Sequence, residues 1–262
     1  MNNNDDLYIP PETYVLGQII RQYYRYPLMS WDDLVNSSLS MLERHPEFET
    51  FELSSLDRLK ENLRRKSKNQ RSLASIINSF YEYYKFEHHL TGSRWGDKTP
   101  LNVFSLEELL TVFPSSQYIH IIRDPLDSVC SYVKSGIYSN VESATNRWVK
   151  AVEISCAFGR SNPEQYKEVF YSDLVSNSEK VTIEVCDFLG IKYQEKMLKE
   201  TYENMGDVER RKHHSGVMKP INKESLGRGG KELSVREKEY IFKRLTLSKE
   251  PVISDFLSHY LN

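Results

Sequence analysis

The sequence predicts an α/β fold, a parallel sheet flanked by helices, and three observations support this. Two apolar runs, residues 117–122 and 168–171, have the character of buried strands, and a helical pattern follows each of them. A long helical pattern over residues 142–160 separates the two runs, and strands connected through a helix pair in parallel with a right-handed crossover. Residues 30–91 are almost entirely helical in period, which predicts a helical insertion covering one side of the sheet. The 262 residues suit a single domain.

The elements of the first half are predicted from local start signals. Residues 7–12 form a short extended piece ended by prolines, and a helical pattern follows from Glu12. Within the insertion, serine residues are placed as N-caps at three helix starts, namely Ser30, Ser54 and Ser72.

The later elements follow the same reasoning. Residues 92–100 are expected to form a loop, after which Thr99 as N-cap and Pro100 as first helical residue open a helix to about Val112. Helices are also predicted over residues 125–134 and 178–189. The last helix is predicted over residues 235–244, followed by a short tail.

Composition excludes several classes of protein. With 35 basic and 37 acidic residues the net charge is −2, so no global field recruits nucleic acid or a membrane surface. No apolar run approaches the ~20 residues of a membrane span, and the first residues lack the parts of a signal peptide. The three cysteines lie far apart, so buried free thiols are expected, as in a reducing cytoplasm: Cys130, Cys156 and Cys186.

Arg123 is the first candidate for a functional residue. It ends the predicted strand, and Asp124 as N-cap with Pro125 as first helical residue begins a helix directly after it. A guanidinium beside the backbone N–H groups of a helix start forms an anion site. Asp127, Ser128 and Ser131 fall on one face of that helix. The alternative is an arginine that only forms an ion pair with Asp124 or Asp127.

Lys98 and Glu12 are the next candidates. Lys98 lies two residues before a predicted helix start, where an anion would also bind; the alternative is a solvated lysine in a capping loop. Glu12 follows two prolines that fix the backbone, so its carboxylate is placed to act as a general base toward a hydroxyl group. The alternative for Glu12 is a first-turn glutamate that complements a helix dipole.

A basic segment, residues 207–231, contains seven lysines and arginines against three acids. It is predicted either to fold over a polyanionic ligand as a lid or to be a solvated loop. Gly227–Lys231 lacks the spacing of a phosphate-binding loop, and no strand precedes it. The adjacent pairs His88–His89 and His213–His214 lack further ligands at metal spacing, so no metal site is predicted from them.

These residues together resemble the sulfotransferases that use 3′-phosphoadenosine 5′-phosphosulfate (PAPS), in the branch of tyrosylprotein sulfotransferases and their bacterial homologues. The likeness runs from about Leu7 to Leu233 and keeps the family's order. It rests on five segments, of which the strand–arginine–helix unit is the most specific: Gly96–Pro100, Tyr118–Ser131, Tyr171–Val175, Asp187–Ile191 and His214–Asn222.

The resemblance implies a role for each candidate. Arg123 and Ser131 would bind the 3′-phosphate of the nucleotide, Glu12 would be the catalytic base, and Lys98 would stabilise the leaving phosphosulfate. Tyr171 and Lys219 match nucleotide-contacting positions. The implied cofactor is PAPS without a metal, and the implied acceptor is a hydroxyl group of a carbohydrate, a small molecule or a peptide tyrosine.

The family also implies a sheet like that of P-loop NTPases, whose first strand and phosphate loop precede the catalytic base. No residues like that loop precede Glu12, so the sequence predicts a chain that begins after this strand. Two functions are therefore open: sulfuryl transfer, or a truncated, non-catalytic nucleotide-binding or interaction module of the same fold. A kinase-type phosphotransferase would need a phosphate loop and a carboxylate for Mg²⁺, and the sequence shows neither.

Overall fold

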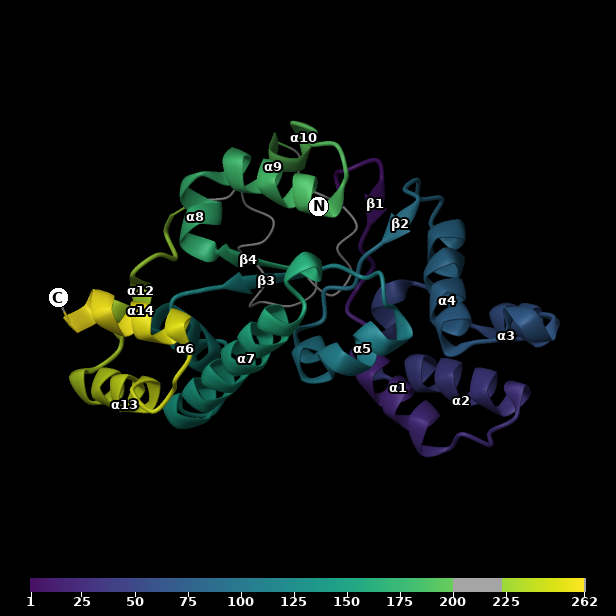
Figure 1. Cartoon of the computed structure of the whole chain (residues 1–262), viewed down its shortest axis with the longest axis horizontal. Coiled ribbons are helices and arrows are strands. Elements are labelled where there is room, and N and C mark those ends of the chain that lie inside the picture. The colour runs from purple at the N-terminus through teal and green to yellow at the C-terminus, as the bar shows by residue number, and fades with distance from the viewer. Residues whose placement is uncertain (200–222, 262) are drawn as a thin grey trace. The chain divides into compact units, whose positions relative to one another are not determined.

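A computed structural model describes residues 1–199 and 223–261 (Figure 1). The chain divides into two compact units, which are described separately. Unit 1 contains residues 1–116 and 191–219, and unit 2 contains residues 117–190 and 220–262. Each unit has its own two-stranded parallel sheet. The predicted α/β class with parallel pairing is therefore confirmed.

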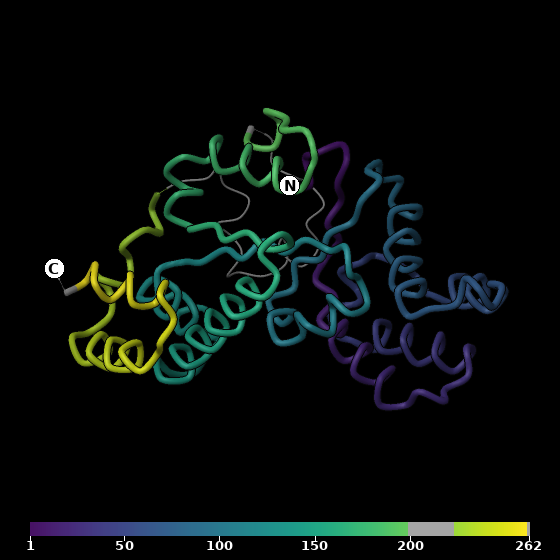
Figure 2. The backbone as a smooth tube through the Cα atoms, in the orientation of Figure 1, coloured from purple at the N-terminus to yellow at the C-terminus, as the bar shows by residue number. Residues whose placement is uncertain are grey.

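Unit 1 is mostly helical. Its strands β1 (Leu7–Tyr8) and β2 (Arg94–Trp95) pair in parallel, Leu7 opposite Arg94. In Figure 2 the long excursion between them is a series of helices, of which α2, α3 and α4 pack against one another. The helices of this unit are α1 (Leu16–Arg25), α2 (Trp31–Glu43), α3 (Asp57–Arg64), α4 (Leu73–Glu87), α5 (Leu106–Val112) and α10 (Lys196–Lys199).

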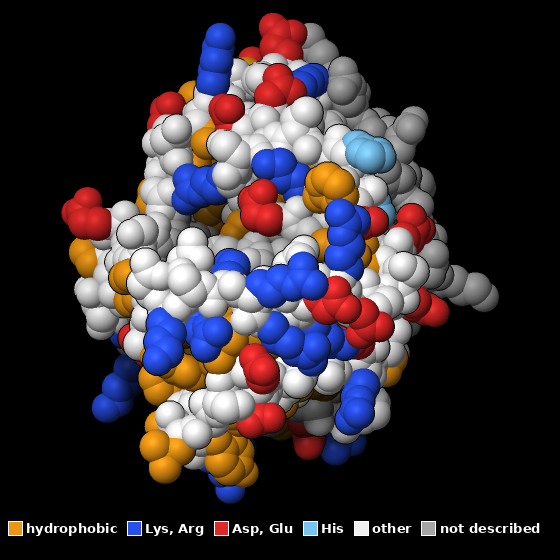
Figure 3. All heavy atoms as spheres, turned by 90° about the vertical axis from the view of Figure 1, so that its right-hand side faces the viewer, with side chains coloured by type: hydrophobic (Ala, Val, Ile, Leu, Met, Phe, Trp, Pro, Cys, Tyr) orange, Lys and Arg blue, Asp and Glu red, His pale blue; other side chains and the backbone are white. Residues whose placement is uncertain are grey.

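The core of this helical region is aromatic. Phe51 is 2% exposed, and its ring lies 5.3 Å from that of Phe80 and 5.7 Å from that of Tyr84. The opposite side of the segment is charged, and Figure 3 shows lysine and arginine side chains gathered on this face. Within residues 57–71 the exposed basic residues are Arg58, Arg64, Arg65, Lys68 and Arg71.

Unit 2 carries the strand pair that the sequence analysis identified. Strand β3 (Tyr118–Ile122) pairs in parallel with β4 (Tyr166–Phe170), with Tyr118 opposite Tyr166 and Ile122 opposite Phe170. Four helices share one apolar core with the end of β3, and they are α6 (Pro125–Lys134), α7 (Val141–Ser161), α13 (Val235–Leu245) and α14 (Pro251–Leu261). The other helices of this unit are α8 (Tyr171–Ser176), α9 (Ser178–Leu189) and α12 (Arg228–Glu232).

Predictions for unit 1 were wrong at the start of α1, in residues 92–100 and in the helix to Val112. Helix α1 begins at Leu16 rather than Glu12, because Tyr14 has a φ of 60°, which a right-handed helix does not accept. The expected loop 92–100 contains strand β2, which exists only through its pairing with β1. The predicted helix to Val112 is divided into a 3₁₀ segment, Pro100–Ser105, and α5.

The prediction of a short tail after residue 244 was also wrong, because residues 251–261 form helix α14. Pro251 stands at its first position, and apolar residues recur at helical spacing after it. Ile253 and Leu257 from this helix enter the core of unit 2.

The three cysteines are free and buried, as predicted. Among residues 1–199 and 223–261, no helix combines the length and the apolar character needed to cross a membrane.

A carboxylate in α6 holds the segment around α12 in place. Asp127, 2% exposed, accepts hydrogen bonds from Gly229 N at 2.7 Å and from Gly227 N at 2.9 Å. The backbone approaches so closely that a Cβ atom at residue 229 would overlap the carbonyl group of Leu126. We call this pair of hydrogen bonds the Asp127 clamp.

The clamp predicts that Gly229→Ala lowers the free energy of unfolding by about 1–3 kcal/mol or more, since the added methyl group forces α12 away from α6. Gly230→Ala is the matched control in the same helix, because its Cβ would meet no atom within 4 Å. Chemical denaturation of both variants measures the difference. Equal stability of the two variants would contradict the close approach at residue 229.

Candidate active site

Strand pairing brings Arg123 and Tyr171 together in unit 2. Parallel strands end at the same edge of a sheet, and Ile122 pairs with Phe170, so the residues that follow them are neighbours. The Arg123 guanidinium carbon lies 5.1 Å from the centroid of the Tyr171 ring, a cation–π contact. Two residues that the sequence analysis proposed for nucleotide binding therefore form one group.

Ser225 completes the contacts of this pair. Arg123 Nη2 donates to the Ser225 carbonyl oxygen at 3.0 Å, and the Tyr171 hydroxyl lies 2.9 Å from Ser225 Oγ. Arg123 Nε is different, because it is buried and has no hydrogen-bond partner within the described residues. A buried donor without a partner costs about 1–3 kcal/mol, and more when it is charged. An anion at this position would remove that cost.

The backbone of Arg123 is fixed from two sides. Its carbonyl oxygen accepts hydrogen bonds from Trp148 Nε1 at 3.1 Å and from Ser128 Oγ at 3.4 Å. Asp124 caps α6 as predicted, accepting from Asp127 N at 3.0 Å. Because Asp124 takes this amide, the guanidinium is the stronger anion-binding group at this strand end.

Neither carboxylate near Arg123 is paired with it in the described part of the chain. Asp127 is engaged by the clamp, and Asp124 accepts a hydrogen bond from the Tyr260 hydroxyl of α14. Burial raises the pKa of Asp124, while the hydrogen bond from Tyr260 acts in the opposite direction. The structure therefore does not favour the simple ion-pair alternative for Arg123.

A cleft of about 330 Å³ opens beside this group. Such a volume lies at the lower end of the range for small-molecule sites. One wall comes from the two strand ends, and the other comes from α14, which the sequence analysis did not expect. Its lining includes Arg123, Tyr171, Leu226, Asp255, Phe256 and His259.

The other proposed binding residues of this region have different positions. Ser131 is exposed on α6 and is not among the residues that line the cleft. Lys219, and most of the basic segment 207–231, lie outside the described residues. The described end of that segment, from Lys223, carries Ser225 and the glycines of the Asp127 clamp.

Glu12 and Lys98 come together in unit 1. Each follows one strand of the β1–β2 pair, so parallel pairing again brings two loops to one edge. Lys98 Nζ forms an ion pair with Glu12 Oε1. The Glu12 side chain is 7% exposed, whereas that of Lys98 is 56% exposed. The pair thus joins a buried carboxylate to an accessible cation, the two group types that proton transfer and charge stabilisation need.

Asp97 holds these two loops together. Its Oδ2 accepts hydrogen bonds from the Tyr81 hydroxyl at 2.7 Å and from Thr13 Oγ1 at 2.8 Å. Thr13 N donates to Thr99 Oγ1 at 3.0 Å, which links the neighbours of Glu12 and Lys98 directly. Burial, followed by the Asp97 charge, raises the pKa of Tyr81 well above its ordinary value.

The backbone after Glu12 is strained. Tyr14 adopts a left-handed conformation at φ 60°, which is uncommon for a bulky residue. Its ring stacks on His45 with centroids 4.9 Å apart. Strain of this kind is often found at functional sites. Glu12 lies before α1 and outside its first turn, so the alternative role as a helix-dipole residue is wrong.

Sequence reasoning missed four residues that position the candidates. Asp97 lies inside a motif that was singled out for its lysine. Asp127 was considered only as a residue of one helix face and as an ion-pair partner of Arg123. Trp148 lies within the helix predicted over residues 142–160, and its indole N–H is a donor that sequence reasoning did not assign to Arg123. No signal pointed to Ser225, because its role depends on long-range contacts.

Comparisons with known proteins identify the family of the chain. Residues 16–195 match the profile described as the sulfotransferase family. The match includes Lys98, Arg123, Ser131 and Tyr171, whereas Glu12 precedes it.

Two solved structures resemble the chain in fold. The sulfotransferase domain from the Synechococcus PCC 7002 olefin synthase has a TM-score of 0.54 at 15% identity, covering 95% of this chain and 96% of that one. The sulfotransferase domain from the curacin biosynthetic pathway has a TM-score of 0.53 at 19% identity, covering 94% of this chain and 90% of that one. At these identities the likeness concerns the fold alone.

The contacts of Asp97 predict that Asp97→Asn lowers the free energy of unfolding by about 1–3 kcal/mol, because an amide turns a donor toward the hydroxyl groups that Asp97 accepts from. Asp6→Asn, at an exposed aspartate of the same unit, is the control. Thermal and denaturant unfolding compare the two variants. A similar loss in both would argue against a special role for Asp97.

Proposed function

The chain belongs to the sulfotransferase family, and we propose that it transfers a sulfuryl group from PAPS to a hydroxyl group of an acceptor. The observation that carries this proposal is the buried, unpartnered Nε of Arg123, beside Tyr171 and a cleft at the end of a parallel strand pair. Ligands of open α/β sheets bind at the carboxyl ends of the strands.

In this proposal Arg123 binds the 3′-phosphate of the nucleotide. Its guanidinium keeps a donor available at Nε, and the Tyr171 ring limits the orientations that the side chain can adopt. Arginine suits phosphate oxygens because its planar donors match their geometry. Ser131 and Lys219 are proposed as further contacts to the nucleotide.

Glu12 and Lys98 are proposed to act at the transferred group, for which the donor supplies the activated sulfur. Glu12 would accept the proton of the acceptor hydroxyl group, a role worth ~10²–10⁴-fold in rate. Lys98 would stabilise negative charge on the leaving phosphate. Removal of one such donor typically raises the activation free energy by ~3 kcal/mol. Because the two side chains are ion-paired, Lys98 has to move from Glu12 to take up this role.

Three classes of acceptor are proposed: a carbohydrate hydroxyl, a small-molecule hydroxyl or a peptide tyrosine. A narrow panel of one sugar, one phenol and one tyrosine peptide samples these chemistries. Transfer of labelled sulfate from PAPS to any of the three identifies the class.

Arg123→Ala is expected to weaken the binding of 3′-phosphoadenosine 5′-phosphate by about tenfold to a hundredfold, the value of one charge-assisted phosphate contact. Arg160→Ala is the matched control, since Arg160 is an exposed arginine of the same unit that pairs with Glu250 at 2.6 Å. Calorimetry measures both affinities. If the two variants bind alike, the assignment of Arg123 to the nucleotide is wrong.

Glu12→Gln is expected to lower turnover by ~10²–10⁴-fold and to leave nucleotide affinity unchanged, because the amide cannot accept the proton. Glu61→Gln, on the exposed face of α3, is the control. Unchanged turnover would exclude the base role. Nucleotide binding by the unmodified chain, with no product from any acceptor of the panel, would instead favour the non-catalytic binding module.

A further inference from the structure

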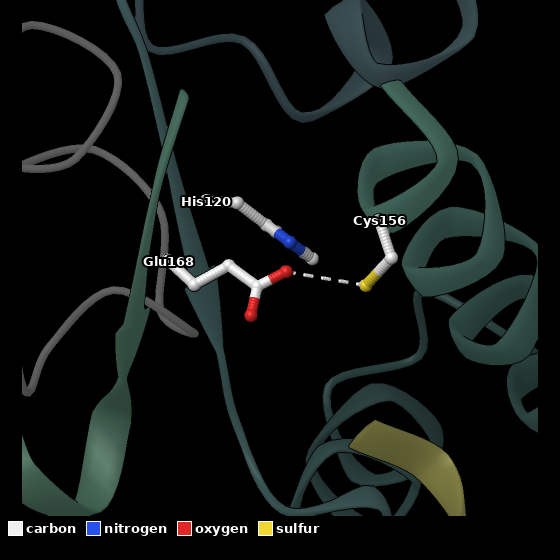
Figure 4. A group of neighbouring side chains, drawn as sticks. All are labelled: His120, Cys156 and Glu168. Carbon is white, nitrogen blue, oxygen red and sulfur yellow. Dashed lines mark hydrogen bonds between the residues drawn. The ribbon is translucent and has the colours of Figure 1, made fainter. Parts of the chain in front are cut away.

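Three side chains of the kinds that bind transition metals converge in unit 2. They are His120 on β3, Glu168 on β4 and Cys156 on α7, and their ligand atoms all lie within 4.8 Å of one another. His120 and Glu168 are direct partners in the strand register, so they share one face of the sheet. Figure 4 shows the cysteine of α7 pointing toward the two strand residues from the helix opposite them.

The cluster is compact but open on one side. Cys156 Sγ lies 3.4 Å from Glu168 Oε1, and the Tyr166 hydroxyl lies 3.3 Å from the same oxygen and 2.6 Å from His120 Nδ1. Cys156 is buried, His120 is half-buried and Glu168 is exposed. An ion from solution can therefore reach the cluster past the glutamate.

We propose that His120, Cys156 and Glu168 bind one divalent transition-metal cation of the zinc type. Imidazole nitrogen, thiolate and carboxylate are the three ligand types of zinc sites in proteins. Ligand atoms around a tetrahedral zinc ion lie about 3.5 Å apart, close to the separation of the thiol and the carboxylate here. A water molecule would occupy the fourth position.

Charge balance supports a dication. The thiolate and the carboxylate carry two negative charges, so a dication leaves the partly buried site neutral. On binding, the Cys156 thiol loses its proton to solvent and a sulfur–metal bond replaces the S–H bond. Arg160, whose charge reaches Cys156, is itself paired with Glu250 at 2.6 Å and does not occupy the cluster.

A neighbouring tyrosine positions the histidine. Tyr166, bonded to His120 Nδ1, would orient the ring in the manner of an outer-shell partner.

The site is separate from the proposed transfer reaction. None of its three ligands lines the cleft beside Arg123. A bound cation would cross-link α7 to β3 and β4, the two strands that are followed by Arg123 and Tyr171. Its expected effect is therefore a rise in the thermal stability of the whole chain, by binding the folded state alone.

The test titrates the metal-free full chain with Zn²⁺ by calorimetry and with Co²⁺ by absorption spectroscopy. One equivalent should bind, Co²⁺ should develop a sulfur-to-metal charge-transfer band, and Mg²⁺ should not compete, since it prefers oxygen ligands. Cys156→Ser should abolish the band. Glu168→Gln should weaken Zn²⁺ binding by about tenfold or more.

Cys130→Ser is the matched control, because Cys130 also contacts a carboxylate, Glu232 at 3.2 Å, but has no histidine in that contact. It should leave metal binding unchanged. Glu168 is exposed, so Glu168→Gln should stay folded, as circular dichroism can show. If Cys156→Ser does not fold, the zinc affinity of Glu168→Gln is the test of the proposal. The proposal is overturned by the absence of saturable Zn²⁺ binding, by a Co²⁺ complex without the thiolate band, or by equal affinity in Glu168→Gln and the unmodified chain.

Discussion

The parallel pairing of β3 with β4 is the constraint on which the candidate site of unit 2 depends. Because Ile122 is registered with Phe170, the next residue of each strand emerges at the same edge. A shift of one residue would turn alternate side chains to the other face and separate Arg123 from Tyr171. The same register sets His120 beside Glu168, so one strand pair positions both the anion-binding group and the proposed metal ligands.

Unit 1 reaches a similar arrangement by different means. Its strands β1 and β2 contain two residues each, too few to fix the loops that follow them. The side-chain hydrogen bonds of Asp97 supply the missing order, and they join the loop of Glu12 to the loop of Lys98. The position of the Glu12 carboxylate therefore depends on this hydrogen-bond network. Loss of one side chain from the network leaves another polar group without its hydrogen bond.

Much of the fold and of the candidate site was predictable from local sequence patterns. The wrong or missing predictions share one cause. The strand before Arg123, the Asp124 cap and Pro125 lie within a few residues, so the sequence displays them together. Strand β2 and the role of Ser225 depend on partners far away in the chain, which no local pattern reveals. The bend at Tyr14 was missed because tertiary packing overrides the helical pattern of its neighbours.

The Asp127 clamp also allows local opening of the structure to be measured by hydrogen exchange. The amide hydrogens of Gly227 and Gly229 are held by a buried carboxylate, so they can exchange with deuterium only when that contact opens. Their protection factors therefore measure the free energy of opening at this one place. Ser225, two residues before Gly227, contacts Arg123, so the clamp and the arginine contact lie in one short segment of the chain.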